Sequence, residues 1–308
     1  MSLAFVFPGQ GSQSIGMLKD LATAHAVVQD TFAAASQVLG YDLWALVQNG
    51  PEEELNQTAK TQPAMLAAGV AVWRVWREQG GPEPVVMAGH SLGEYSALVC
   101  ADALAFEDAI DLVAARGQLM QQAVPAGQGA MAAILGLDDD QVRAVCAAAA
   151  QGEIVEAVNF NSPGQVVVAG AAAAVQRAMA GAKAAGAKRA LALAVSAPSH
   201  CALMRPAAER LAERLAMVTI TTPRIPVLHN ADVEAYTDAA AIRAALVRQL
   251  HQPVRWVETI KAMSAQGVTT VLECGPGKVL AGLIKRIDAA LIALPVYDTV
   301  TLQQALAG

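Results

Sequence analysis

Charged residues are scarce in this sequence, and acidic residues outnumber basic ones. Only 16% of the 308 residues are charged, and 21 Lys and Arg residues stand against 27 Asp and Glu residues, which gives a net charge of −6 at pH 7. A protein whose main partner is nucleic acid usually shows a basic patch and a high isoelectric point. The composition therefore argues against nucleic acid as the main partner.

Paired cysteines and long apolar runs are also lacking. The four cysteines form no C-x-x-C pair and are widely spaced, at positions 100, 146, 201 and 274, which is typical of free thiols in a reducing cytosol. No apolar run is long enough to span a bilayer. The apolar segment 3–7 has no cationic start and runs into Pro8, which is unlike a signal peptide. We therefore expect a cytoplasmic protein without a membrane segment.

Apolar residues, in contrast, are abundant, at 55% of the chain. This is enough for a sizeable core and too much for a disordered chain. Most domains hold roughly 100–200 residues, so we expect one large domain with an insertion, or two domains.

Apolar runs of strand length alternate with helical patterns through most of the chain. Strands are expected at 3–7, 84–88, 225–230 and 269–274. Helices are expected at 17–40, 62–79, 94–100, 106–124, 201–218, 239–250 and 278–287. This alternation predicts a mainly parallel sheet with helices packed on its faces.

The middle of the chain has a different order of elements. Strands are expected at 131–137, 154–158, 165–169 and 188–195, with helices at 138–151 and 172–185. Asp138 and the two aspartates after it are suited to cap the first of these helices. The order β-α-β-β-α-β is the ferredoxin-like pattern. We therefore predict a small ferredoxin-like subdomain at 127–197, inserted into a large α/β domain formed by 1–126 and 198–308.

A candidate nucleophile lies between an expected strand and an expected helix. Residues 89–93 read GHSLG and match G-x-S-x-G, with Ser91 at the centre. In this motif a sharp turn exposes the serine hydroxyl, and the glycines remove side chains that would clash. The following helix offers its N-terminal dipole to a developing oxyanion. We therefore predict that Ser91 is a catalytic nucleophile in an α/β-hydrolase-like domain.

A serine hydroxyl needs a base, and the chain offers five histidines. His200 is favoured because it lies in a polar turn where the insertion ends and a helix begins. His90 adjoins Ser91 and should point elsewhere on a sharp turn. From position alone, His229, His251 and a purely structural role for His200 remain open.

Several spaced motifs together resemble one known family. They are FPGQGSQ at 7–13, GHSLGE at 89–94, RG at 116–117, NFNSPGQ at 159–165, PSH at 198–200 and GPGK at 275–278. In this order they resemble the malonyl-CoA:acyl carrier protein transacylases of bacterial type II fatty acid synthesis. The resemblance extends to about residue 287. It implies transfer of malonyl from malonyl-CoA to the phosphopantetheine thiol of acyl carrier protein through an ester on Ser91.

The resemblance also implies roles for further residues. His200 would be the general base, held by the backbone carbonyl of Gln249 in place of an Asp. Backbone N–H groups of Gln10 and Leu92 would form the oxyanion hole. Arg116 would bind the free malonyl carboxylate, although its place at the edge of an apolar helix stripe also fits a side chain that reaches water. The segment containing Asn161 is expected to be a turn, and this residue either lines the cleft or bonds the local backbone.

Other functions lead to different expectations. A thioesterase or esterase of the α/β-hydrolase type would show an HGG-type oxyanion loop and more strands before the nucleophile, and this sequence has neither. A non-catalytic module that binds carrier proteins would not need the Ser91, His200 and Arg116 set. Malonyl loading in a polyketide pathway would use the same chemistry. We expect a free-standing monomer that binds malonyl-CoA and, transiently, acyl carrier protein, with no metal or cofactor.

Overall fold

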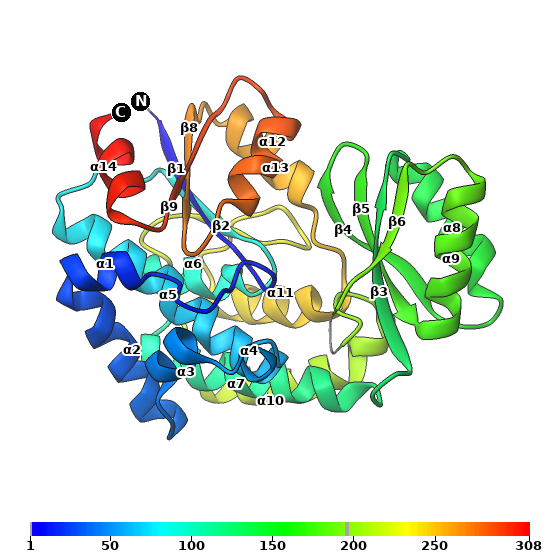
Figure 1. The fold of residues 1–308 in the computed structure, drawn as a ribbon, viewed down its shortest axis with the longest axis horizontal. Coiled ribbons are helices and arrows are strands. Elements are labelled where there is room, and N and C mark those ends of the chain that lie inside the picture. Colours follow the sequence, from blue (N-terminus) through cyan, green and yellow to red (C-terminus); the bar gives the residue numbers. More distant parts are fainter. Residues whose placement is uncertain (1, 195–196) are drawn as a thin grey trace.

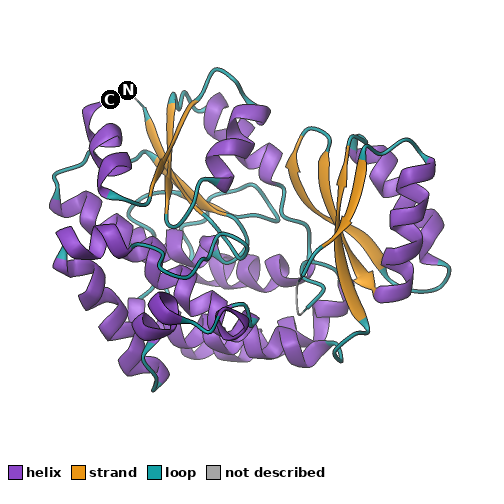
Figure 2. Cartoon of the chain, viewed as in Figure 1, coloured by secondary structure: helices purple, strands orange, loops and turns teal. Residues whose placement is uncertain are grey.

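Two β-sheets organise the chain in the computed structural model, which describes residues 2–194 and 197–308. One sheet has five strands and the other has four, and they lie side by side in Figures 1 and 2. Many helices surround the five-stranded sheet, whereas two helices cover the outer side of the other (Figure 2). The mixed α/β class expected from the sequence is confirmed.

The five-stranded sheet is parallel throughout, in the order β7-β2-β1-β8-β9. Its strands are β1 (Leu3–Phe7), β2 (Val86–Gly89), β7 (Val227–Leu228), β8 (Thr270–Cys274) and β9 (Ile292–Val296). Strands β1, β2 and β8 are buried along their whole length, as expected of parallel strands that are covered on both faces. This explains why the sequences of β1 and β2 are continuous apolar runs, whereas β8 also buries the polar Thr270 and Glu273.

One or more helices follow each strand of this sheet. They are α1 (Lys19–Ala24), α2 (Ala26–Leu39), α3 (Leu43–Asn49), α4 (Glu52–Leu55), α5 (Thr58–Glu78), α6 (Gly93–Cys100), α7 (Phe106–Ala123), α10 (Arg205–Met217), α11 (Ala239–His251), α12 (Trp256–Ala265), α13 (Val279–Ile287) and α14 (Thr299–Ala307), with the 3-10 helix η1 (Ala202–Met204). Within the described residues, none of the helices combines the length and the apolar character needed to cross a membrane.

Alternate side chains of β1 face two different helical layers. Phe5 and Phe7 belong to a large core with α2, α5, α6 and α7, where the Phe5 ring meets Trp73 edge-on at 5.2 Å between ring centroids. Ala4 and Val6 face the opposite way, into a second core with α12 and α13. This alternation is the strand period of two, and it fixes the carboxyl ends of β1 and β2 between the two layers.

The four-stranded sheet is antiparallel, in the order β4-β5-β3-β6. Its elements follow one another as β3 (Gly129–Leu135), α8 (Asp139–Ala150), β4 (Val155–Ser162), β5 (Gln165–Ala171), α9 (Ala172–Ala184) and β6 (Arg189–Ala192). Both helices pack on the face that carries Ile134 and Val168. The opposite face carries Met131 and Val167, which cluster with Cys201 from beyond the sheet. The second face therefore points toward the five-stranded sheet. The expected cap on α8 is confirmed, because the Asp138 side chain forms a capping box there.

Some expected elements differ in the structure. The single helix expected at 17–40 is wrong: α1 and α2 are separate, and His25 between them has extended backbone angles. The helix expected from 62 begins four residues earlier, at Thr58. The strand expected at 225–230 is only two residues long. Five elements, α3, α4, α12, β9 and α14, were not expected at all.

The link at 159–164 is also different from the expectation of a turn. Strand β4 continues through Asn159 to Ser162 because these residues still pair with β5, and the turn is limited to residues 163–164. Asn159 also forms a parallel bridge with Val254: the N–H of Phe160 donates to the carbonyl of Val254 at 3.0 Å, and the N–H of Val254 donates to the carbonyl of Val158 at 2.8 Å. Pairing between neighbouring strands therefore makes the turn shorter than its composition predicts. The strand expected at 188–195 corresponds to β6 as far as Ala192, and Val195 lies outside the described residues.

Candidate active site

Ser91 lies in a sharp turn between β2 and α6. Its φ is +53°, in the left-handed region that residues with a Cβ rarely adopt. The glycines on either side are required by close backbone contacts: a Cβ added at Gly89 would lie 1.8 Å from the carbonyl carbon of Gly93, and one added at Gly93 would lie 2.1 Å from the carbonyl oxygen of Phe7. The sequence G-x-S-x-G thus folds into the strand-turn-helix that it predicts, with the serine at its apex.

Asn230 holds this strained turn in place. Its Oδ1 accepts the Ser91 N–H at 2.7 Å, and its Nδ2 donates to the carbonyl of Gly89 at 2.6 Å. Asn230 is fully buried, and its own N–H donates to Glu94 Oε2 at 2.9 Å. Neither Asn230 nor Glu94 is among the site residues predicted from the sequence. The available signals were a polar residue two positions after the end of β7 and an acidic residue three positions after the nucleophile.

His200 is the histidine that the structure brings to Ser91. Its Nε2 lies 2.7 Å from Ser91 Oγ, and its Nδ1 lies 2.7 Å from the backbone carbonyl of Gln249. A carbonyl only accepts, so Nδ1 carries the proton and Nε2 is free to accept the serine proton. The Gln249 backbone therefore fixes the tautomer that a general base requires.

The pKa of His200 is strongly perturbed. Burial of the ring, followed by repulsion from the nearby Arg116 charge, lowers this pKa from 6.5 to about 3, although the hydrogen bond to the Gln249 carbonyl opposes the shift. The imidazole is therefore neutral at physiological pH and available as a base.

The other histidines near the turn have different partners. His90 Nε2 pairs with Asn161 Oδ1 at 2.8 Å, and burial lowers the pKa of His90. His229 Nδ1 lies 2.7 Å from Glu94 Oε1. Within the described part of the chain, His200 alone places a ring nitrogen within hydrogen-bond distance of Ser91 Oγ. Asn161 belongs to β4, and its side chain bonds His90 instead of capping a turn.

Arg116 is buried beside the nucleophile. Its side chain is 1% exposed, so it does not reach water from the helix edge. Its Nη1 donates to Gln62 Oε1 at 2.7 Å, and its Nη2 donates to Gln249 Oε1 at 2.9 Å and lies 3.4 Å from Ser91 Oγ. No ion pair between described residues includes Arg116. Burial lowers the pKa of this guanidinium, as expected for a cation without a direct counter-charge.

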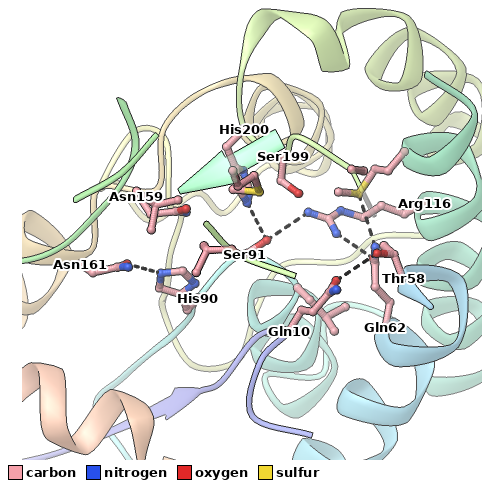
Figure 3. A pocket seen from close by; sticks show the side chains of 16 residues that line it. Gln10, Thr58, Gln62, His90, Ser91, Arg116, Asn159, Asn161, Ser199 and His200 are labelled. Carbon is pink, nitrogen blue, oxygen red and sulfur yellow. Dashed lines mark hydrogen bonds between the residues drawn. The ribbon is translucent and has the colours of Figure 1, made fainter. Parts of the chain in front are cut away.

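These groups meet in a cavity of about 180 Å³ between the two sheets (Figure 3). Figure 3 shows Ser91 between His200, Arg116 and Gln10, with His90 and Asn161 on the other side. The cavity is lined by Gln10, Thr58, Gln62, His90, Ser91, Leu92, Arg116, Met120, Met131, Asn159, Asn161, Val167, Leu193, Ala197, Ser199 and His200. It therefore collects every site residue predicted from the sequence except Gln249, which contacts the site from behind through His200 and Arg116.

The low pKa of His200 predicts an unusual pH dependence. Because the base stays neutral down to a pH of about 3, acylation of Ser91 in single turnovers should change less than roughly threefold between pH 5 and 7.5. A histidine with an unshifted pKa would lose about 30-fold over the same range. The rate is measured by stopping the reaction at known times and determining the fraction of acylated enzyme by protein mass spectrometry. An acid limb with its midpoint near pH 6.5 would contradict the expectation.

The same shift affects stability. The unfolded chain takes up a proton on this histidine below its ordinary pKa of 6.5, but the native protein does so only near pH 3. The contribution of His200 to the free energy of unfolding therefore falls as the pH drops from 6.5 toward 3.

The chain is similar to known proteins along nearly its whole length. An acyl transferase domain model matches residues 4–291. The malonyl CoA-acyl carrier protein transacylase of Salmonella typhimurium is 59% identical over 303 residues, covering 98% of each chain. That of Haemophilus influenzae is 63% identical over 296 residues, covering 96% of this chain and 95% of the relative.

Solved structures are equally similar. An acyl carrier protein S-malonyltransferase from Vibrio cholerae has a TM-score of 0.97 and 62% identity over 99% of both chains. A malonyl-transacylase in complex with a type II polyketide synthase acyl carrier protein has a TM-score of 0.99 and 62% identity, over 100% of this chain and 99% of that one. The chain therefore belongs to the acyl transferase family and, within it, to the malonyl-CoA:acyl carrier protein transacylases.

Proposed function

We propose that this chain moves a malonyl group from malonyl-CoA to the phosphopantetheine thiol of acyl carrier protein, through a covalent ester on Ser91, and so supplies malonyl-acyl carrier protein for fatty acid synthesis. One observation carries the proposal. The Ser91–His200 pair opens into the same cavity as a buried Arg116 that forms no ion pair with any described residue. A nucleophile and an unpaired cation in one cavity match an acyl thioester that ends in a carboxylate.

The reaction follows from this geometry in two half-reactions. In the first half-reaction, Ser91 Oγ gives its proton to His200 Nε2 and attacks the thioester carbonyl, which forms a tetrahedral intermediate. When this intermediate collapses, the C–S bond breaks, and CoA leaves with the proton from His200. The phosphopantetheine thiol then gives its proton to the same nitrogen and attacks the Ser91 ester. When the C–O bond breaks, the proton returns to Ser91 Oγ. His200 thus acts as base and then acid in each half.

The oxyanion of each tetrahedral intermediate requires donors near Ser91. The N–H of Leu92 stands at the start of α6, and the loop after β1 brings Gln10 to the same cavity. Neither N–H donates to another described residue. The two loops lie close together, because a Cβ added at Gly9 would be 2.6 Å from the carbonyl oxygen of His90. These two donors are therefore our candidates for the oxyanion hole, with the α6 dipole behind them.

Arg116 selects the acyl group in this proposal. Its guanidinium faces the cavity with a planar fork suited to two-point binding of a carboxylate. Its neighbours Gln62 and Gln249 hold it in place through neutral amide oxygens, and Glu94 acts on its charge without forming an ion pair with it. A malonyl carboxylate would supply a direct counter-charge, whereas an acetyl group would not.

The names of the relatives and one solved complex point to acyl carrier protein as the acceptor. The solved relative with a TM-score of 0.99 is in complex with a type II polyketide synthase carrier protein, so the same chemistry serves that pathway as well. For this chain we propose a cytoplasmic monomer that supplies fatty acid synthesis.

We also propose a division of the chain that explains the cavity. Residues 1–126 and 198–308 would form a hydrolase-like catalytic domain, and residues 127–197 a ferredoxin-like subdomain. The element order β3-α8-β4-β5-α9-β6 supports the subdomain. Met131, Asn159 and Asn161 then contribute one wall of the cavity from the subdomain, and the catalytic domain contributes Ser91 and His200.

Intact-protein mass after brief mixing with malonyl-CoA tests the covalent route. The wild type should gain one malonyl group, and the Ser91→Ala variant should gain none, because the ester oxygen is absent. A chase with holo-acyl carrier protein should remove the group from the enzyme. Release of CoA without any adduct would point to a hydrolase, and neither adduct nor release would point to a different acyl donor.

A further inference from the structure

Two glutamine side chains hold the Arg116 guanidinium from different elements. Gln62 lies on α5 and Gln249 on α11, and both are buried, at 1% and 0% exposure. Each presents its Oε1 to one nitrogen of Arg116, at 2.7 Å and 2.9 Å. The guanidinium carries only donors, so the amide oxygens must face it.

The remaining contacts fix the direction of each amide. Gln249 Nε2 donates to the Ser91 carbonyl at 2.7 Å and to Glu94 Oε2 at 3.2 Å. Gln62 Nε2 points to Met120 Sδ at 3.4 Å. Rotation of the Gln249 amide would place its oxygen against two acceptors, so its orientation is locked. Glu94 is itself held by His229 and by the Asn230 N–H. The acceptors around Arg116 are therefore preorganised.

Amides and carboxylates have nearly the same shape and differ in charge. Two amide oxygens orient the fork without neutralising it, whereas one carboxylate in the same place would form a buried ion pair with the guanidinium. Such an ion pair would occupy the charge that a substrate carboxylate needs. Keeping a cation buried without a direct counter-charge is costly for stability, which a purely structural arginine would not require.

We propose that the Gln62 and Gln249 side chains are specificity-determining residues, a neutral clamp that aims Arg116 at the cavity and preserves its charge for an acyl group bearing a carboxylate. The proposal rests on the proposed function, because it assumes that Arg116 binds that carboxylate. Neither glutamine side chain acts on the reacting atoms. They act through Arg116, so their effect should fall on the choice of acyl group more than on the chemistry of acyl transfer.

Gln62 is the cleaner position for a test. A change at Gln249 removes the bond to the Ser91 carbonyl and faces Glu94. In Gln62, by contrast, Oε1 accepts from Arg116, and Nε2 donates to the Met120 thioether. The decisive pair is Gln62→Glu, which changes charge at nearly constant shape, and Gln62→Met, which removes the acceptor without adding charge.

The measurement is kcat/KM for acylation by malonyl-CoA and by acetyl-CoA, with thermal unfolding as a check on folding. Gln62→Glu should reduce the malonyl-to-acetyl preference by about 100-fold, mainly by raising KM for malonyl-CoA. The new carboxylate would pair with Arg116 in place of the malonyl carboxylate, and loss of a buried charge pair weakens binding by about this factor. Gln62→Met should reduce the preference by less than about tenfold, the range of one hydrogen bond. Should Gln62→Glu fail to fold, Gln62→Asp, which adds the same charge on a shorter side chain, carries the same expectation.

Two results would overturn the inference. One is an unchanged preference in the glutamate variant, and the other is an equal loss in the glutamate and methionine variants, which would assign the effect to hydrogen-bond geometry instead of charge. Arg116→Ala separates this failure from failure of the proposed function. If that variant loses the malonyl preference while Gln62→Glu keeps it, the carboxylate role of Arg116 stands and the neutral clamp is wrong. If both variants keep the preference, the role of Arg116 itself is wrong.

Discussion

Replacement of His200 by Ala is expected to slow acylation of Ser91 by about 10²–10⁴-fold, the usual contribution of a positioned general base. The reason is the hydrogen-bond chain from Ser91 Oγ through the His200 ring to the Gln249 carbonyl, with both distances at 2.7 Å. Without the ring, the hydroxyl must lose its proton to water. The affinity for malonyl-CoA should change little, because Arg116 remains in place. Single-turnover acylation followed by intact mass measures the rate.

His25→Ala is a matched control for this variant. His25 is half-buried between α1 and α2 and does not line the cavity, so its replacement should leave the acylation rate unchanged. The acylated His200→Ala enzyme should also transfer malonyl slowly to carrier protein, because the same nitrogen takes the thiol proton in the second half-reaction. Acylation at the wild-type rate would mean that the base lies elsewhere.

The nucleophile was accessible from the sequence because its geometry is local. An apolar strand, a turn with glycines at 89 and 93, and a helix all lie within fifteen residues, and each glycine is required by a backbone contact that a Cβ would violate. The strain at Ser91 is therefore encoded by its neighbours. The parallel sheet was accessible for the same reason, since strands buried on both faces must be continuous apolar runs.

The base was harder to identify because its contacts are long-range. His200 is 109 residues from Ser91 in the sequence and 49 from Gln249. Position alone left His229 and His251 open, and family resemblance singled out the residue that the fold brings to Ser91. The sequences around these three histidines do not show which one is the base. The distinction comes from tertiary contacts, such as the pairing of His229 with Glu94.

The polar network behind the site was not predicted at all. Gln62, Glu94 and Asn230 are buried polar residues whose partners belong to other elements. In the sequence each looks like a polar residue on the exposed side of a helix or at the end of a strand. A buried polar group must find hydrogen bonds, but the sequence does not say where. The end of strand β4 was also misjudged, because pairing with β5 continues through its turn-like residues as far as Ser162.

Replacement of Arg116 by Ala should have the second large effect, and it should discriminate between acyl groups. We expect kcat/KM for malonyl-CoA to fall by about 10²–10³-fold, since removing one partner of a buried charge pair costs roughly 3–5 kcal/mol. Acetyl-CoA has no carboxylate to lose, so its kcat/KM should change far less. Parallel acylation kinetics with the two thioesters measure the ratio, and equal losses on both would contradict the carboxylate role.

The stability of the free enzyme separates this role from a structural one. Arg116 is buried, its hydrogen-bond acceptors are neutral, and its Nε has no partner among the described residues. In Arg116→Met the removal of a buried charge should offset the loss of the donor to Gln62 Oε1 and Gln249 Oε1, so the melting temperature should change little. A large fall in melting temperature would assign the arginine to the fold. A variant that is at least as stable yet loses malonyl transfer would mean that the protein tolerates this buried charge for the sake of its substrate.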